Sequence, residues 1–147
     1  MIFQFRFEAL LKQRQFNLKK CQSDLAVVQC RYQELKSKEL EIIQQIAHHA
    51  KLCEDDQSRG MNVAAYLCFK DYGASLARQL QNLRNELMKA SQEVEEKKGA
   101  LLECEKAVKM LECLEEKELQ EHRYLQAHKE QKELDEISIL KGFHEKD

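Results

Sequence analysis

The chain has 147 residues, with 24 Lys and Arg against 26 Asp and Glu, no Pro, no Trp and only four Gly. So few turn-forming residues argue against a β-rich fold, and the composition is typical of long helices or a coiled coil. A net charge of −2 argues against nucleic acid as a main ligand, and no apolar run approaches the length of a membrane span.

The first predicted element is a helix over about residues 3–53. Eleven of fourteen positions in a series with alternating steps of four and three residues are apolar or Cys. This spacing is the heptad repeat of a coiled-coil seam, and it is held well beyond the three or four heptads that support such an assignment. The series consists of Phe7, Leu11, Arg14, Leu18, Cys21, Leu25, Val28, Tyr32, Leu35, Glu39, Ile42, Ile46, His49 and Cys53.

A loop is predicted next, over about residues 54–62. This stretch is polar, is rich in turn formers and contains Gly60. Asn62 or Ser58 is expected to cap the helix that follows.

The second predicted helix covers about residues 63–140. In its heptad series, which runs from Tyr66 to Leu111, twelve of fourteen positions are apolar or Cys. The pattern then fades where an antiparallel partner helix would run out, because in this register residue 3 lies opposite residue 113. We therefore predict an all-α fold, a long antiparallel two-helix coiled-coil hairpin with a C-terminal helical overhang, in a single domain over residues 1–147.

The cysteines and histidines of the chain do not have the spacing that metal binding or catalysis requires. The six cysteines form no CxxC pair, and none of the five histidines follows a glutamate by three residues. The spacings of zinc ribbons, thioredoxin-like motifs and helical di-iron sites are therefore missing. Two paired helices also offer no cavity that could exclude water from a reaction. We expect no metal, no cofactor and no enzymatic activity; a helical enzyme would instead show a reactive thiol or a bound metal.

Charge and aromatic residues are unevenly distributed. Residues 1–53 hold nine basic and five acidic groups, whereas residues 112–147 hold six basic and eleven acidic groups. The seam does not use Phe3, Phe5 or Tyr72. Large aromatic groups left exposed beside a thin core predict contacts with a partner.

Three segments resemble the FliJ family of flagellar type III export proteins. Residues 3–14, FQFRFEALLKQR, resemble the family's opening pattern of aromatic, Glu, paired Leu and Arg positions. The start of the second helix and the segment QKELDEIS, residues 131–138, resemble the corresponding family regions, so the resemblance spans nearly the whole chain. The positions that carry it outside the last segment are Phe5, Phe7, Glu8, Leu10, Leu11, Arg14, Tyr66, Phe69, Leu76 and Leu80.

The resemblance implies a non-enzymatic cytoplasmic component of the flagellar type III protein export apparatus. Family members are similar to the central stalk of rotary ATP synthases. Their open end binds the hexameric export ATPase and promotes its assembly and activity, and their other end meets the export gate membrane protein and substrate-specific export chaperones. The implied location is peripheral, at the cytoplasmic face of the inner membrane at the flagellar base.

Two sets of contact residues follow from the resemblance. The ATPase-facing set comes from both termini and consists of Phe3, Phe5, Arg6, Phe7, Leu134, Asp135, Glu136 and Ile137. The set facing the gate or the chaperones consists of Tyr66, Phe69, Tyr72 and Leu76. Two alternatives stay open: the equivalent stalk protein of a type III secretion injectisome, and a generic coiled-coil scaffold that pairs with itself through its seams.

Overall fold

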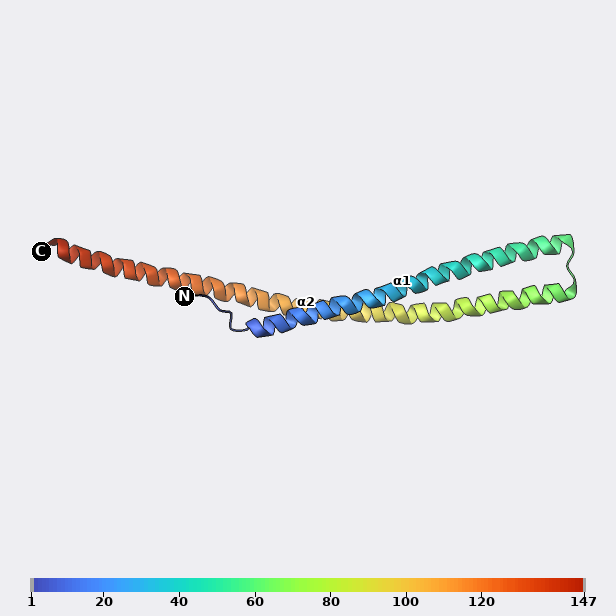
Figure 1. Cartoon of the computed structure of the whole chain (residues 1–147), viewed down its shortest axis with the longest axis horizontal. Helices are drawn as coiled ribbons and strands as arrows, with labels where there is room; N and C mark the ends of the chain where they lie inside the picture. Colours follow the sequence, from blue (N-terminus) through green and yellow to red (C-terminus); the bar gives the residue numbers. More distant parts are fainter. Residues whose placement is uncertain (1, 147) are drawn as a thin grey trace. The chain divides into compact units, whose positions relative to one another are not determined.

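The computed structural model describes residues 2–146 and consists of two helices, α1 from Glu8 to Arg59 and α2 from Val63 to Lys146 (Figure 1). No strand occurs among the residues that it describes. The two helices pack against each other, so the prediction of an all-α helical hairpin is confirmed.

The turn between the helices takes only three residues, because a glycine ends α1 and an asparagine starts α2. Gly60 has a φ of 90°, a left-handed conformation that a residue without a Cβ adopts with little strain. The side-chain Oδ1 of Asn62 accepts a hydrogen bond of 2.7 Å from the backbone N–H of Ala65. Asn62 is therefore the N-cap of α2, and it is one of the two residues expected in that role.

The predicted helix ends differ from the observed ones. α1 continues to Arg59 rather than ending near residue 53. The polar residues that read as a loop are tolerated in a helix because all of them except Asp56 are exposed, and only Gly60 needs a left-handed backbone. α2 continues to Lys146 rather than ending near residue 140. An isolated glycine such as Gly142 costs a helix only about 1 kcal/mol, and no proline follows it.

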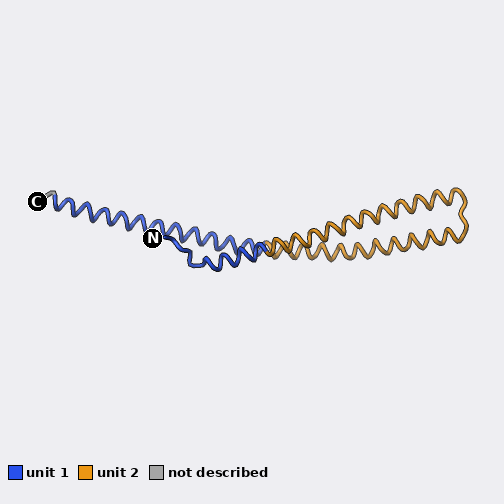
Figure 2. The backbone as a smooth tube through the Cα atoms, in the orientation of Figure 1, with its two compact units in different colours: residues 1–19, 102–147 blue, residues 20–101 orange. Residues whose placement is uncertain are grey.

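Contacts divide the chain into two compact units, which Figure 2 shows in different colours. Unit 1 comprises residues 1–19 and 102–147, and unit 2 comprises residues 20–101. Each unit contains a piece of both helices and has its own buried cluster. Every predicted seam position except Arg14 and Tyr66 is buried or half-buried, so the heptad pattern identified the core-facing side of both helices.

The core of unit 2 is built from leucines of both helices. Leu35 on α1 packs with Leu83, Leu87 and Ala90 on α2, and Tyr32 and Ile42 extend this cluster. Ion pairs flank it, including one with 3.8 Å between Nε of Arg84 and Oε2 of Glu39. Glu39 is half-buried but its partner Arg84 is exposed. Pairs with an exposed partner add at most about 1 kcal/mol, so apolar burial holds the two helices together.

Candidate functional site

The first candidate surface lies in unit 1 and begins with residues 2–7, here called the N-terminal strap. The strap precedes α1 and runs beside α2 as a non-helical segment (Figure 1). Three phenylalanines at every second position alternate with Gln4 and Arg6. In a non-helical segment this period of two places Phe3 and Phe5 on the side opposite Gln4, and residues 6 and 7 then form a turn that leads into α1. Phe3, Phe5 and Phe7 are buried or half-buried, whereas Gln4 and Arg6 are exposed.

The strap is anchored by its rings and by one ion pair. Phe5 is 7% exposed and joins Leu11 and Val108 in the buried cluster of unit 1. The Phe3 ring lies 5.5 Å from the His122 ring, centroid to centroid. The Arg6 guanidinium stacks on the Phe7 ring at 4.6 Å and donates to Oε1 of Glu118 at 3.2 Å.

Two expectations about the N-terminus were wrong. The helix was predicted from about residue 3, but α1 begins at Glu8, because the strap phenylalanines alternate with period two rather than the helical 3.6. Residue 3 was expected opposite residue 113, but Phe3 lies against His122. An extended segment advances about 3.3 Å per residue against 1.5 Å in a helix, so the strap reaches further along α2.

The exposure expected for Phe3 and Phe5 was also wrong, whereas Phe7 was expected to pack as a seam residue. Phe5 is buried and Phe3 is half-buried, as is Phe7, because the strap uses all three to cover α2. Of the four predicted ATPase-facing residues in this segment, only Arg6 presents its side chain freely to solvent.

The second candidate surface is the exposed C-terminal part of α2, residues 127–144, here called the overhang. Every residue from 127 to 141 is exposed. Leu134 and Ile137 are 58% and 50% exposed, and Asp135 accepts a 3.1 Å hydrogen bond from Gln131 on the same helix. Leu134 lies twelve residues beyond His122, about 18 Å along the helix axis, so the overhang residues and the strap form separate surfaces.

Sequence reasoning missed three further apolar residues of the overhang, Ile139, Leu140 and Phe143, which are all exposed. Ile139 and Phe143 fall on the heptad series of α2 when it is continued past Leu111, whereas Leu140 does not, and the positions between Leu111 and Ile139 are mostly polar. Leu134, Ile137, Leu140 and Phe143 are three residues apart, so they spread over about 180° of the helix surface. The signal that could have found them is this continued supply of large apolar residues after the seam fades.

The third candidate surface lies in unit 2, next to the turn. Nε2 of His49 lies 2.8 Å from the backbone oxygen of Phe69, and the His49 ring packs against the rings of Phe69 and Tyr72. A shallow hollow of about 400 Å³ beside them is almost wholly apolar. Its lining consists of His49, Leu52, Ala65, Cys68, Phe69 and Tyr72.

The four residues predicted to face the gate or chaperones do not share one environment. Tyr66 and Tyr72 are exposed and Phe69 is half-buried, so these three can meet a partner. Leu76 is 2% exposed, because it occupies a seam position and packs into the hairpin core. Leu76 can support this surface from below, but its side chain cannot touch a partner.

Gly73 makes room for His49, and this gives a stability prediction. A Cβ on Gly73 would lie 3.2 Å from Nε2 of His49, whose ring is held by the contact to Phe69 and by Tyr72. A Cβ on Gly99, also in α2, would meet nothing within 4 Å. Gly99→Ala should therefore stabilise the protein by about 0.5–1 kcal/mol, whereas Gly73→Ala should lower its melting temperature. Thermal unfolding followed by circular dichroism measures both melting temperatures. An equal increase in melting temperature for the two variants would show that His49 is not held in place.

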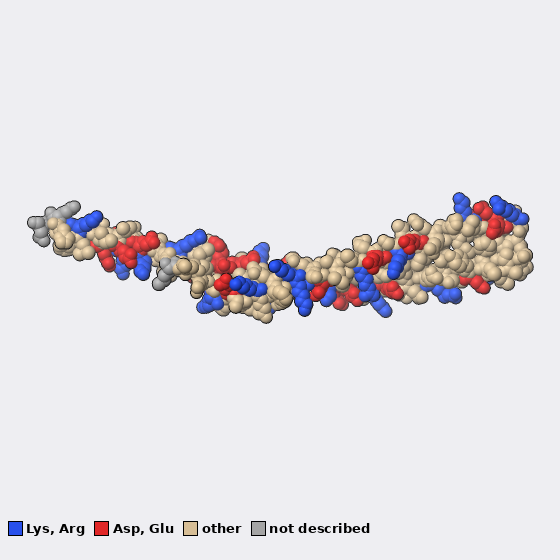
Figure 3. All heavy atoms as spheres, viewed as in Figure 1, with Lys and Arg blue, Asp and Glu red and all other residues tan. Residues whose placement is uncertain are grey.

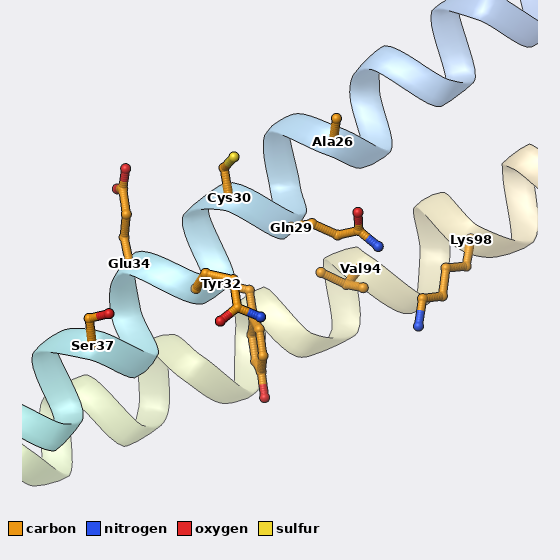
Figure 4. Close-up of a pocket in the computed structure, with 9 residues that line it drawn as sticks. Ala26, Gln29, Cys30, Tyr32, Glu34, Ser37, Val94 and Lys98 are labelled. Atoms are coloured by element: carbon orange, nitrogen blue, oxygen red, sulfur yellow. The ribbon is translucent and has the colours of Figure 1, made fainter.

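A wide open groove of about 760 Å³ also lies in unit 2 (Figure 4). Tyr32 and Val94 lie between α1 and α2, whereas Cys30 points away from α2. The groove lining contains this cysteine but no histidine, so it does not provide a Cys–His pair. Among the described residues no group of three or more His, Cys, Asp or Glu side chains is placed to hold a metal ion. Within the same residues, neither helix has a segment long and apolar enough to cross a membrane.

The chain matches one protein family in sequence and is similar to a solved structure in fold. The family model described as "Flagellar FliJ protein" matches residues 3–146. A solved structure from Chlamydia trachomatis, described as a YscO homolog named CT670, is similar in fold with a TM-score of 0.51 and 19% sequence identity over 99% of both chains. A search of curated proteins gave no match.

Proposed function

The chain belongs to the flagellar FliJ protein family, and from this premise we propose that it is a non-enzymatic, cytoplasmic component of the flagellar type III export apparatus. Its terminal end binds the hexameric export ATPase and promotes the assembly and activity of the ring. Its other end contacts the export gate membrane protein and substrate-specific export chaperones at the cytoplasmic face of the inner membrane, at the flagellar base.

The observation that carries this proposal is the shape of the apolar surface on the overhang. A helix that meets one neighbouring helix needs an apolar stripe of about 100°. The apolar residues from Leu134 to Phe143 cover about half of the helix circumference and are exposed. A partner that encloses the helix, such as the pore of a ring, covers such a surface better than a single helix does.

Charge supports the same partner. Residues 112–147 hold six basic and eleven acidic groups. Acidic and basic side chains both lie along the exposed part of α2 (Figure 3). Asp135 and Glu136 sit between Leu134 and Ile137, so the apolar contacts are flanked by negative charge. A pore wall with basic side chains would favour this helix and disfavour an acidic competitor.

The gate and chaperone contacts are proposed for the surface beside the turn. Tyr66 and Tyr72 offer exposed aromatic rings, Phe69 lines the apolar hollow, and Leu76 supports them from the core. Aromatic residues around a hollow are typical anchors of protein interfaces.

A double substitution on the overhang tests the ATPase contact. Leu134→Asp combined with Ile137→Asp should weaken binding to the immobilised export ATPase hexamer by at least about tenfold, because both side chains lose apolar contact and add charge to an acidic helix. The melting temperature should not change, because both residues are exposed. Surface plasmon resonance and circular dichroism measure the two quantities.

The matched control is Val27→Asp combined with Leu40→Asp, two exposed apolar residues on α1 in unit 2. This variant should bind the ATPase as the unchanged chain does. Equal weakening by both double variants would remove the overhang from the contact. If the chain does not bind the ATPase and forms a dimer with itself, it is instead a generic coiled-coil scaffold.

A further inference from the structure

The N-terminal strap is bound in a way that suggests a second state. We propose that the strap is a releasable cover, which leaves α2 while the two helices stay paired, and that the terminal end must release it to bind the export ATPase. The second half of this proposal rests on the proposed function, whereas the first half concerns the protein alone.

The strap is held by side chains and not by its backbone. Within the part of the chain that the structure describes, its main-chain hydrogen bonds reach only the first turn of α1: Phe5 O accepts from the N–H of Glu8 at 3.2 Å, and Phe7 O accepts from the N–H of Leu11 at 2.9 Å. Its ion pair uses the exposed Arg6, and exposed pairs contribute little. A segment without a backbone ladder to its support can open locally without unfolding the rest.

One contact under the strap is unfavourable in the closed arrangement. Nε2 of His122 is buried and finds no hydrogen-bond partner among the described residues. The Phe3 ring, which packs against the His122 ring, offers no hydrogen-bonding group there. A buried polar atom without a partner costs stability, and release of the strap gives this nitrogen access to water.

Release changes two surfaces at once. It uncovers Glu118 and His122 of α2, which Arg6 and Phe3 contact, and it removes Phe5 from the apolar cluster against which Leu111 and Leu114 pack. It also frees Phe5, whose side chain is buried and cannot touch any partner while the strap is closed. The strap phenylalanines, which are proposed to contact the ATPase, therefore pack against α2 in this structure. They can contact a partner fully only after the strap is released.

The first arm of the test uses the protein alone. The chain has no tryptophan, so Phe3→Trp places a single indole on the strap. Its fluorescence reports strap release in urea, while circular dichroism at 222 nm reports the helices. We expect the fluorescence transition at a lower urea concentration than the helical transition. Ile2→Trp, at a residue that is 93% exposed, gives the signal of a free indole.

His122→Leu provides the matched change, because it removes the unpaired nitrogen but keeps an apolar contact for Phe3. In the Phe3→Trp background it should shift the fluorescence transition to higher urea. His48→Leu, at an exposed histidine of α1 in unit 2, should leave that transition in place. If fluorescence and helicity change together in every variant, the strap is not a separate element and the proposal is overturned.

The second arm measures binding to the export ATPase hexamer. If the strap must leave, a more stable closed state lowers the fraction of competent protein, and His122→Leu should bind about tenfold more weakly than the unchanged chain and His48→Leu. Unchanged or tighter binding by His122→Leu would overturn the requirement for release. If the unchanged chain itself does not bind, the proposed function fails, and the urea experiment still decides whether the strap is releasable.

Discussion

Replacing Leu83 with Asp is expected to open the helical hairpin of unit 2. Leu83 is 7% exposed and packs with Leu35 and Leu87 in the buried cluster. Loss of a buried leucine side chain alone costs about 2–5 kcal/mol, and the new carboxylate has no buried partner, which adds to the penalty. Because small proteins are stable by only about 5–15 kcal/mol, helicity at 222 nm and the melting temperature should both fall steeply.

Met88→Asp is the control for this substitution. Met88 lies five residues further along α2 and is 64% exposed, so it receives the same charge without burying it. Its melting temperature should stay within about 2 °C of the unchanged protein. Similar losses for both variants would show that general charge, and not seam packing, controls the stability of the hairpin.

Deleting residues 127–147 is expected to abolish ATPase binding while the hairpin stays folded. Residues 127–141 are all exposed, and the contacts that the described strap residues make on α2 lie before the cut, at Glu118 and His122. The truncated chain should therefore keep its melting temperature and lose only the circular dichroism signal of the deleted turns. Its affinity for the ATPase hexamer should drop by at least about 100-fold, because the exposed apolar side chains of the overhang are removed.

The cut must not be made earlier. Removing residues from 113 onward would also delete Glu118 and His122, which anchor Arg6 and Phe3 of the strap. A loss of binding in that shorter chain would mix two causes. If the chain without residues 127–147 still bound the ATPase fully, the overhang would not be its contact surface.

Much of the fold could be predicted from the spacing of apolar residues alone. The heptad series placed Leu35, Leu83 and Leu87 on facing sides of two helices, and the structure buries them there. The spacing of the apolar residues matches the burial of their side chains because each helix of a two-helix hairpin buries one side, and residues on that side recur every three or four positions. The short turn was harder to predict, since polar residues in an exposed helix end read as a loop.

The candidate site was less predictable, because exposure depends on what lies across from a residue. Phe5 stood outside the heptad series and was expected to be exposed, yet the strap buries it. The alternation of Phe3, Phe5 and Phe7 is a local signal for a non-helical segment. The long heptad pattern that follows it led us to predict a helix from about residue 3 instead. For Leu76, family resemblance pointed to a contact residue, whereas its seam position pointed correctly to the core.

The most direct test of the central proposal is ATP hydrolysis by the export ATPase in a titration with this chain and with the chain lacking residues 127–147. The full chain should stimulate hydrolysis and saturate at about one chain per six ATPase subunits, as one overhang in one ring requires. The truncated chain should not stimulate. No stimulation by the full chain, equal stimulation by both chains, or saturation at one chain per subunit would contradict the assignment of this protein as a stalk in the ring.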